Sequence, residues 1–369
     1  MKIAQVAPLY ESVPPRLYGG TERVVSYLTE ELVRQGHDVT LYASGDSRTS
    51  ARLRAVCDRA LRLQYGKSSD GKSNGAAHGN LSGDPLAWHV LLVEIVMQEA
   101  GRFDIVHFHL DYLPFSLLRR SQIPALTTVH SRLDVPCLYP LFREFRDMNL
   151  VSISDAQRAP MPWASWLETI HHGLPETLLK PCYEPEGYLA FLGRISPEKR
   201  VDLAVEIARR AEMPLRVAAK VDPANRDYFE TVRHLLRDPH VEFLGEIGEQ
   251  GKSEFLGRAR ALVFPIDWPE PFGLVMIEAL ACGTPIIAFR RGSVEEIVED
   301  GVTGFIVDTM DQAVNAAGRV ASLDRKACRR AFEQRFSARR MSNRYLCAYE
   351  RVIDLAGRQH STDTLRLVS

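Results

Sequence analysis

The amino-acid sequence predicts an α/β protein built from two doubly wound parallel-sheet domains, Rossmann-like in form, that face each other across a cleft. Three observations lead to this prediction. Short apolar runs alternate with helical periodicity in both halves of the chain, a proline-rich segment separates the halves, and 369 residues exceed what one hydrophobic core usually holds. Repeated strand–helix units imply parallel sheets covered by helices on both faces.

The first half alternates predicted strands with helical segments. Strands are predicted at residues 2–9, 37–44, 105–110, 124–130 and 149–155, and helical periodicity lies at 20–35 and 85–100. Residues 66–84 are rich in glycine, serine and asparagine, which predicts a mobile surface loop.

The second half repeats the alternation more regularly. Strands are predicted at 188–195, 215–221, 241–247, 261–266, 284–289 and 304–307, with helices at 201–211, 225–237 and 251–260. We therefore expect an N-terminal domain over 1–172, a proline-rich linker over 173–187 and a C-terminal domain over 188–340. A terminal helical segment, 341–369, is expected to return to the N-terminal domain.

Composition excludes several classes of protein. A formal net charge of −1 argues against nucleic acid as a partner, because phosphate backbones recruit strongly basic surfaces. Six scattered cysteines favour reduced thiols over a disulfide framework or zinc site. No apolar run approaches the ~18 residues of a membrane span, and the first ten residues resemble a strand rather than a signal peptide. A cytoplasmic protein is expected.

Two glutamates stand out near the C-terminal end, in ALVFPIDWPEPFGLVMIEALACGTPIIAF over residues 261–289. Glu278 interrupts a helix that is otherwise apolar all round, and a buried carboxylate needs a partner. Glu270 precedes the helix start, where orphan N–H groups and the helix dipole favour an anion. Their convergence at a strand end suits a ligand that has hydroxyls and phosphates. The alternative is a helix-capping Glu270 and an internal Glu278–Arg salt bridge.

Other candidate residues lie at the predicted strand ends of the first half. Gly19 and Gly20 form a turn before a helix, which either lets backbone N–H groups approach a phosphate or is a purely structural tight turn. His130 ends a strand where ligands of such sheets bind, although a lone histidine is more often structural. His107 and His109 share one strand face, and no third ligand joins them at metal-binding spacing.

The second half offers a candidate phosphate site. Arg194 and Lys199, in GRISPEK, flank a turn that opens a helix, and their charges either suit a diphosphate or are solvated surface charges. The backbone N–H groups of Phe272, Gly273 and Leu274 lie at a helix start and can hold phosphate oxygens.

Together these motifs resemble one family. GGTERVV, the strand end at His130, GRISPEK, EPFGLVMIEALACGTPIIA and DGVTGFIV are similar to a retaining glycosyltransferase of family 4 with the GT-B fold, over nearly the whole chain. The resemblance implies a metal-independent, retaining hexosyltransferase. It would move a sugar from a nucleotide-diphosphate sugar, UDP- or GDP-linked, to a sugar, lipid or small-molecule acceptor. The nucleotide sugar would be a substrate, and no cofactor is implied.

The resemblance also implies roles for residues of the C-terminal, donor-binding domain. Arg194 and Lys199 would hold the diphosphate and stabilise the departing charge. Glu270 would contact hydroxyls of the transferred sugar, and Glu278 would bond the nucleotide ribose. The amides of residues 272–274 would bind sugar hydroxyls or phosphate. The catalytic group is therefore expected to comprise Glu270, His130, Arg194 and Lys199.

In the N-terminal, acceptor-side domain, Gly19 and Gly20 would border the diphosphate and His130 would touch a sugar hydroxyl. The chain departs from the family where His172-Gly173 replaces the usual Asn-Gly, a change expected to be harmless. The segment ARLRAVCDRALRL is read either as a basic amphipathic helix for peripheral membrane contact or as an ordinary segment packing on the sheet, the second being favoured.

Other functions fit the sequence less well. A sugar phosphorylase that uses pyridoxal phosphate needs a Schiff-base lysine, and a nicotinamide dehydrogenase needs a GxGxxG motif, neither of which is evident. From a different class, a two-lobed sugar or nucleotide-sugar binding protein without transferase activity would share the cleft. It would have no need of a diphosphate clamp.

Overall fold

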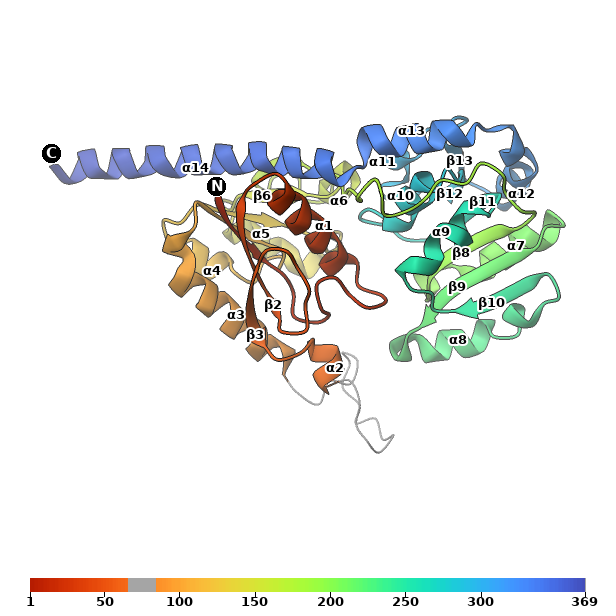
Figure 1. Cartoon of the computed structure of the whole chain (residues 1–369), viewed down its shortest axis with the longest axis horizontal. Helices are drawn as coiled ribbons and strands as arrows, with labels where there is room; N and C mark the ends of the chain where they lie inside the picture. Colours follow the sequence, from red (N-terminus) through yellow and green to blue (C-terminus); the bar gives the residue numbers. More distant parts are fainter. Residues whose placement is uncertain (66–83, 369) are drawn as a thin grey trace. The chain divides into compact units, whose positions relative to one another are not determined.

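The computed structural model describes residues 1–65 and 84–368, and the side chains of the terminal helix as far as residue 358. The chain divides into two compact units (Figure 1). The first unit consists of Met1–His171 together with Ala338–Ser369, and the second of His172–Ser337. Each unit contains one parallel β-sheet flanked by helices, so the predicted α/β class with two doubly wound sheets is confirmed.

The first unit holds a seven-stranded sheet with the order β3-β2-β1-β4-β5-β6-β7, in which every neighbouring pair is parallel. Its strands are β1 (Lys2–Val6), β2 (Asp38–Ser44), β3 (Arg52–Cys57), β4 (Ile105–Phe108), β5 (Ala125–Thr128), β6 (Leu150–Ser152) and β7 (Trp166–Thr169). Its helices are α1 (Gly20–Arg34), α2 (Leu61–Tyr65), α3 (Pro85–Glu99), α4 (Phe115–Leu118), α5 (Tyr139–Glu144), α6 (Asp155–Arg158) and α14 (Ala338–Val368).

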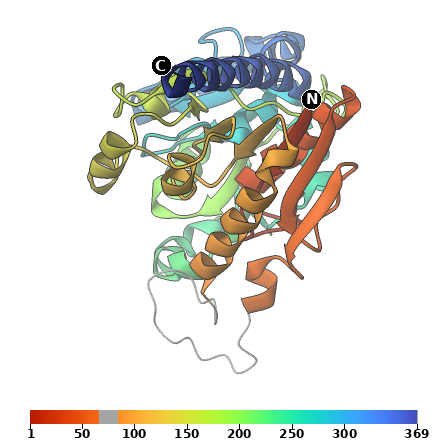
Figure 2. The same ribbon diagram turned by 90° about the vertical axis from the view of Figure 1, so that its left-hand side faces the viewer.

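The strand order reverses between β1 and β4, which makes the carboxyl ends of these two strands the switch point of the sheet. Alternation along β1 assigns the two faces. Ala4 and Val6 pack into the apolar cluster that contains Leu92 and Val96 of α3. Gln5 points to the other face, where its side chain bonds Tyr349 of α14. Figure 2 shows α3 in orange and α14 in dark blue on these two faces.

The second unit holds a six-stranded sheet with the order β10-β9-β8-β11-β12-β13, again parallel throughout. Its strands are β8 (Leu189–Ile195), β9 (Leu215–Val221), β10 (Val241–Gly245), β11 (Ala261–Phe264), β12 (Ile286–Phe289) and β13 (Gly304–Val307). Its helices are α7 (Val201–Arg210), α8 (Arg226–Val232), α9 (Glu249–Gly257), α10 (Leu274–Ala281), α11 (Val294–Ile297), α12 (Met310–Arg319) and α13 (Arg325–Arg335).

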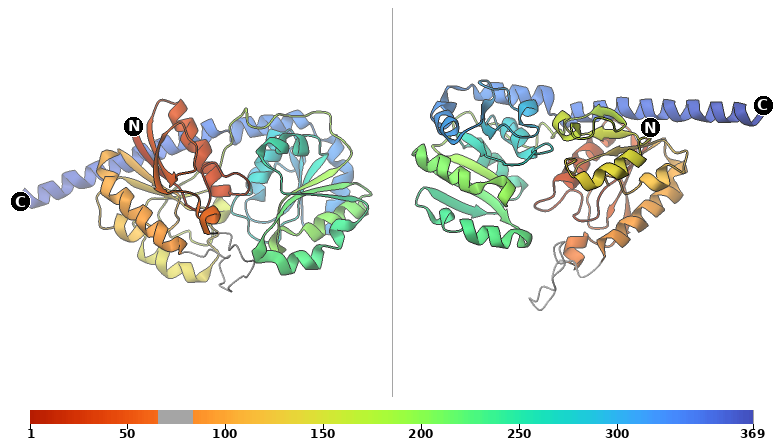
Figure 3. Two further views of the ribbon diagram at one scale, coloured as in Figure 1. Left: turned by 60° about the horizontal axis from the view of Figure 1, so that its bottom comes forward. Right: turned by 180° about the vertical axis from the view of Figure 1, so that it is seen from behind.

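Helices cover the six-stranded sheet on both faces (Figure 3). On one face α7 and α12 pack against each other and against the strands. On the other face α10 contacts β11 and β12 and is flanked by α9 and α13. Because α10 is enclosed by a sheet and two helices, its sequence is apolar on nearly every side.

All the predicted strands are present, but two further strands, β3 and β7, are not in the sequence-based prediction. The amphipathic-helix interpretation of residues 51–63 is wrong. Arg52–Cys57 forms strand β3, which pairs with β2, and a short helix follows only from Leu61. Leu53 and Ala51 pack against a cluster that contains Leu41 and Val25, so the segment does pack on the sheet.

The interpretation of residues 173–187 as a linker is also wrong, because this segment is part of the second unit. Leu174 and Leu179 are buried, and backbone N–H groups bond neighbouring elements: Leu174 to Phe336, Cys182 to Cys282 and Glu186 to Arg258. The chain passes between the units at residues 171–172 and 337–338 instead.

The terminal helix α14 packs on α1, β4 and β5 of the first unit. The glycine-rich loop predicted at 66–84 lies outside the described residues, except for Asp84, whose carboxylate caps the start of α3. In the part of the chain that the structure describes, no helix combines the length and apolar character needed to cross a bilayer.

Candidate active site

The best-defined cluster of predicted site residues lies just beyond the carboxyl ends of β8 and β11. The ammonium of Lys199 donates a short hydrogen bond to Oε2 of Glu270, and Trp268 Nε1 donates to the same oxygen at 2.7 Å. Both charged side chains are nearly buried, at 13% and 11% exposure. Lys199 Nζ also lies 5.3 Å from the centre of the Trp268 ring. Because both donors bind Oε2, the second oxygen of Glu270 can accept from a hydroxyl.

Arg194 lies at the end of β8, five residues before Lys199. Its guanidinium donates to Glu198 Oε1 at 3.2 Å, and its side chain is 26% exposed. Lys199 ends a short 3-10 turn, Pro197–Lys199, that leads into α7. The end of β8 and the turn that follows it thus carry one cation each, each paired with one carboxylate, at the edge of the sheet where ligands of doubly wound folds bind.

The loop after β11, which carries Glu270, is held in place by the loop after the neighbouring strand β12. Gly292, in the loop after β12, has a φ of 54°, and a Cβ there would lie 2.3 Å from the carbonyl oxygen of Glu270. The next residue, Ser293, donates its backbone N–H to that carbonyl and its hydroxyl to the carbonyl of Phe272. Only glycine permits so close an approach, so Gly292 and Ser293 fix the backbone around Glu270.

The predicted phosphate site lies at the start of α10. Gly273 is the residue before the helix and has a φ of 78°, a left-handed conformation that favours glycine. No side chain caps the helix there, so the alternative in which Glu270 caps α10 is wrong. The ring of Phe272 is buried and packs edge-on against His172, with centroids 4.7 Å apart. Its contribution to a site would come from its backbone.

Glu278 is buried as predicted and has a cationic partner. Lys252 Nζ donates to Glu278 Oε1 at 2.6 Å, and the two side chains are 11% and 4% exposed. A second carboxylate, that of Glu249, lies 3.7 Å from the same ammonium. The partner is therefore a lysine of α9 and not the arginine of the alternative interpretation. The pair uses one oxygen of Glu278 and leaves Oε2 to accept from a ligand hydroxyl.

Sequence reasoning missed Lys252, although a signal was present. Lys252, Phe255 and Leu256 stand at positions i, i+3 and i+4 of α9 and share its buried face. A lysine on an apolar helix face needs an acidic partner inside the protein, and Glu278 is the acidic residue of the adjoining helix. Gly292 and Ser293 were missed as well.

In the first unit, Gly19 and Gly20 lie between β1 and α1. A Cβ on Gly19 would lie 2.7 Å from Cβ of Pro15, so packing alone requires glycine there. Gly20 is the first residue of α1, whose N-terminus carries no side-chain cap. Glu22, in the first turn, is 5% exposed, and burial raises the pKa of its carboxyl to about 7. The structural interpretation thus accounts for Gly19, and the backbone near Gly20 stays available to an anion.

His130 follows β5 at the carboxyl edge of the same sheet. Its backbone N–H donates to Asp111 Oδ1 at 2.8 Å, and its ring nitrogen Nε2 lies 2.9 Å from Nδ1 of His109. Burial lowers the pKa of His130 to about 4, while the Asp111 carboxylate acts in the opposite direction. The ring is therefore neutral at physiological pH. Within residues 1–65 and 84–368, no group of three or more potential ligands is arranged to hold a metal ion.

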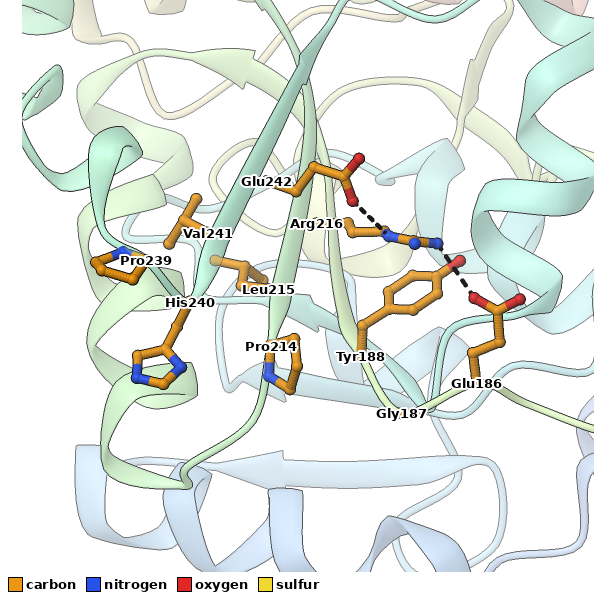
Figure 4. A pocket seen from close by; sticks show the side chains of 10 residues that line it. All are labelled: Glu186, Gly187, Tyr188, Pro214, Leu215, Arg216, Pro239, His240, Val241 and Glu242. Atoms are coloured by element: carbon orange, nitrogen blue, oxygen red, sulfur yellow. Dashed lines mark hydrogen bonds and ion pairs between the residues drawn. The ribbon is translucent and has the colours of Figure 1, made fainter.

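A cavity of about 320 Å³ opens at the other edge of the six-stranded sheet, beside the amino ends of β8, β9 and β10 (Figure 4). Arg216 crosses it, with hydrogen bonds to Glu242 at 2.7 Å and Glu186 at 3.3 Å, and its guanidinium lies over the Tyr188 ring. The charges that line this cavity are paired with each other. Since ligands of such sheets bind at carboxyl ends, this cavity is not the candidate active site.

Two family models match the chain, one on each side of residue 172. The model described as Glycosyltransferase Family 4 matches residues 18–172, and the model described as Glycosyl transferases group 1 matches residues 180–335. The chain belongs to the family 4-type glycosyltransferases. The resemblance seen in the sequence motifs is thereby confirmed.

Relatives of this glycosyltransferase share about a quarter of its residues. A phosphatidyl-myo-inositol mannosyltransferase of Mycobacterium leprae is 25% identical over 345 residues, which span 88% of this chain and 87% of the relative. An uncharacterized glycosyltransferase of Methanocaldococcus jannaschii is 24% identical over 357 residues, 83% of this chain and 85% of that one.

Solved structures show the same fold. AviGT4, a glycosyltransferase involved in avilamycin A biosynthesis, has a TM-score of 0.66 at 22% identity, with 96% of this chain and 98% of that chain covered. HepE of Anabaena, solved in complex with UDP, has a TM-score of 0.68 at 16% identity, with 94% and 98% covered. The predicted GT-B fold is therefore confirmed.

Proposed function

We propose that this glycosyltransferase moves a hexose from a nucleotide-diphosphate sugar to an acceptor with retention of the anomeric configuration. The observation that carries the proposal is the nearly buried pair of Lys199 and Glu270, with the partly exposed Arg194 close by in the sequence, at the carboxyl edge of the six-stranded sheet. A nucleotide sugar presents a diphosphate and a ring of hydroxyls. Cations match the first and carboxylate oxygens match the second.

Two further features of the second unit support a nucleotide donor. The start of α10 has no side-chain cap, so its backbone N–H groups can donate to phosphate oxygens. Glu278, further along the same helix, has Oε2 to accept from a ribose hydroxyl. Structures of HepE hold UDP, UDP with glucose, and UDP-glucose. We accordingly propose a UDP- or GDP-linked donor. In the first unit, we assign the Gly19–Gly20 turn to a phosphate and His130 to a sugar hydroxyl.

The chemistry follows from where the charges lie. An inverting enzyme needs a general base on the acceptor hydroxyl, but His130, whose pKa is held at about 4 by burial, is a weak base. We propose that the departing phosphate oxygen takes the acceptor's proton on the face it leaves. The glycosidic bond to phosphate breaks, the bond to the acceptor oxygen forms, and the nucleoside diphosphate departs. Arg194 and Lys199 stabilise the charge that develops on it.

Glu270 has two roles in this proposal. Its Oε2 holds Lys199 in place through the shared hydrogen bond, and Oε1 accepts from a hydroxyl of the transferred sugar. The negative charge close to the sugar ring also favours the positive charge that develops at the anomeric carbon. No cofactor beyond the nucleotide sugar is required by this scheme.

Isothermal titration calorimetry with UDP, GDP, ADP and free hexoses tests the proposal. The account predicts binding of one nucleoside diphosphate and no measurable binding of free hexoses without it. A panel of nucleotide sugars, scored by release of the nucleoside diphosphate, then identifies the donor sugar. Binding of a free sugar with no nucleotide affinity would instead identify a sugar-binding protein and would refute the proposal.

A further inference from the structure

Arg200, which directly follows Lys199, has a left-handed backbone. Its φ is 52° and its ψ is 53°, at the junction between the 3-10 turn Pro197–Lys199 and helix α7. A side chain is strained in this conformation, whereas glycine adopts it readily. Strain of this kind persists where the surrounding structure requires the residue, so we expect the Arg200 side chain to have a role that glycine could not fill.

The guanidinium of Arg200 is held between two aspartates. Its Nε and Nη2 donate to the carboxylate of Asp202, in the first turn of α7, at 2.9 to 3.2 Å. From α8, the hydroxyl of Tyr228 donates to Oδ1 of the same carboxylate at 2.9 Å. This local pair sets the direction of the guanidinium, and its Nη1 donates to Oδ2 of Asp267 at 3.1 Å, 67 positions further along the chain.

Asp267 lies in the loop after β11 and contacts the loops on both sides. Its backbone N–H donates at 3.0 Å to the carbonyl of Glu198, in the turn after β8. Its Oδ1 lies 3.7 Å from Nε of Arg291, in the loop after β12. Since β8, β11 and β12 are neighbours in the sheet, one carboxylate connects the carboxyl ends of three adjacent strands. The side chains of Arg200, Asp267 and Arg291 are here called the Asp267 bridge.

The Asp267 bridge lies beside the pair formed by Lys199 and Glu270. Lys199 precedes Arg200 directly, and three positions separate Glu270 from Asp267. The ion pair between Arg200 and Asp267 therefore closes a ring that also contains the hydrogen bond from Lys199 to Glu270. A shift of one loop against the other would separate these two site residues, and the bridge opposes such a shift.

Stability alone does not explain the strained backbone. The side chains of Asp267 and Arg291 are 52% and 46% exposed, and ion pairs so exposed contribute little to the free energy of folding. The guanidinium of Arg200 is the group that can reach two carboxylates at once, because its donors form a rigid fork. The position of the loops is therefore what the arginine secures.

We propose that Arg200 and Asp267 are positioning residues that hold Lys199 against Glu270 in the geometry that sugar transfer requires. The Asp267 bridge stands on the contacts just described, and only its use on a nucleotide sugar rests on the proposed function. Neither residue is assigned a contact with the substrate. The two residues act through the loops that carry Lys199 and Glu270.

Arg200→Ala and Arg200→Gly separate the backbone from the side chain. Both variants lose the bridge, but only glycine relieves the left-handed conformation, so Arg200→Gly should melt about 1–4 °C above Arg200→Ala. Both should share one loss of kcat, about three- to thirtyfold, which is less than the ~10²-fold cost of a 1 Å misplacement. KM for the donor should change less than kcat. A parent-like kcat in Arg200→Gly would overturn the proposal.

Asp267→Asn tests the other partner, and Arg210→Ala is the matched control. Arg210 is the last residue of α7 and bonds Asp311 of α12 at 2.5 Å, so the control also loses an ion pair between two elements. Asp267→Asn should lower kcat about as much as Arg200→Ala, and Arg210→Ala should leave it unchanged. The double variant should lose hardly more than the larger single loss, because the two residues act as one unit. Losses that multiply would refute the bridge.

Hydrogen–deuterium exchange of the full-length protein tests the bridge without any substrate. Peptides over residues 265–272 contain the amide of Asp267, which bonds the carbonyl of Glu198. These peptides should exchange several-fold faster in Arg200→Ala than in the parent, with peptides of α12 unchanged. Equal exchange over 265–272 in Arg200→Ala and Arg210→Ala would refute the bridge. Faster exchange in Arg200→Ala, in a protein that turns over no nucleotide sugar, would support the bridge and refute the proposed function.

Discussion

Replacement of Glu278 by glutamine tests the nucleotide-binding role against a purely structural one. The substitution removes the negative charge that Lys252 pairs with at 2.6 Å, in surroundings where both side chains are nearly buried. Breaking a buried ion pair typically costs about 3–5 kcal/mol of stability. Glu249, 3.7 Å from the same ammonium, keeps one carboxylate close to it. We therefore expect Glu278→Gln to lower the free energy of unfolding by about 1–3 kcal/mol.

The effect on ligand affinity has a separate origin. If Oε2 of Glu278 accepts from a ribose hydroxyl, a charged acceptor becomes a neutral one. Hydrogen bonds to charged groups contribute about 1.5–3 kcal/mol, so the dissociation constant for the nucleoside diphosphate should rise by about ten- to a hundredfold. A purely structural Glu278 would change stability and leave affinity in the folded protein untouched.

The assay combines urea unfolding with titration calorimetry below the unfolding transition, and Lys252→Met is the matched control. That variant loses the same ion pair and should lose at least as much stability, because it leaves a buried carboxylate alone. It retains the oxygens of Glu278, so its nucleotide affinity should fall less than that of Glu278→Gln. If both variants unfold more easily and both bind UDP, GDP and ADP as the parent does, the ribose-binding role of Glu278 is refuted.

Three further predictions concern charge and pH. Burial raises the pKa of the Glu22 carboxyl from 4.5 to about 7. The contribution of Glu22 to stability is therefore complete below pH 4.5 and is lost as the pH rises to about 7, which lowers the free energy of unfolding by about 3 kcal/mol. Glu22→Gln should remove this loss in urea unfolding at pH 5 and pH 8, and an unchanged pH dependence would contradict it. Arg194→Ala and Lys199→Ala should each lower kcat by about 10²–10³-fold and weaken donor binding less than that. Weaker donor binding with a nearly unchanged kcat would exclude transition-state stabilisation by these cations. Since two cations and a helix start can neutralise the diphosphate, turnover should persist in EDTA, and loss restored by Mn²⁺ would contradict this.

The accuracy of the strand predictions follows from where each strand lies. The central strands of both sheets are buried on both faces, so they appear in the sequence as continuous apolar runs. The two missed strands, β3 and β7, are the two edges of the seven-stranded sheet. Arg52 and Arg54 of β3 are exposed, and every residue of β7 is partly exposed. Polar side chains on edge strands remove the apolar continuity on which the prediction depends.

The candidate site was predictable in its residue types and less so in its contacts. A carboxylate in an apolar helix predicts that a cationic partner lies nearby. Which residue that partner is, here Lys252, depends on how α9 packs beside α10, and the local sequence does not specify this packing. His107 and His109 were placed correctly on one strand face. Their connection through Gln5 to Tyr349, 344 positions away, exists only because the terminal helix packs on the first unit. The linker prediction failed for the same reason, since proline content does not reveal that Leu174 and Leu179 are buried.

Proton NMR of the first-formed product tests the central claim most directly. The donor that the nucleotide-sugar panel selects is incubated with an accepted hydroxyl compound, and the coupling constant of the new anomeric proton is read before any anomerisation. The account predicts that an α-linked donor gives an α-linked product, because the departing phosphate, held by Arg194 and Lys199, receives the acceptor's proton on its own face. A β-linked product would contradict the mechanism and would require a general base that this account does not contain.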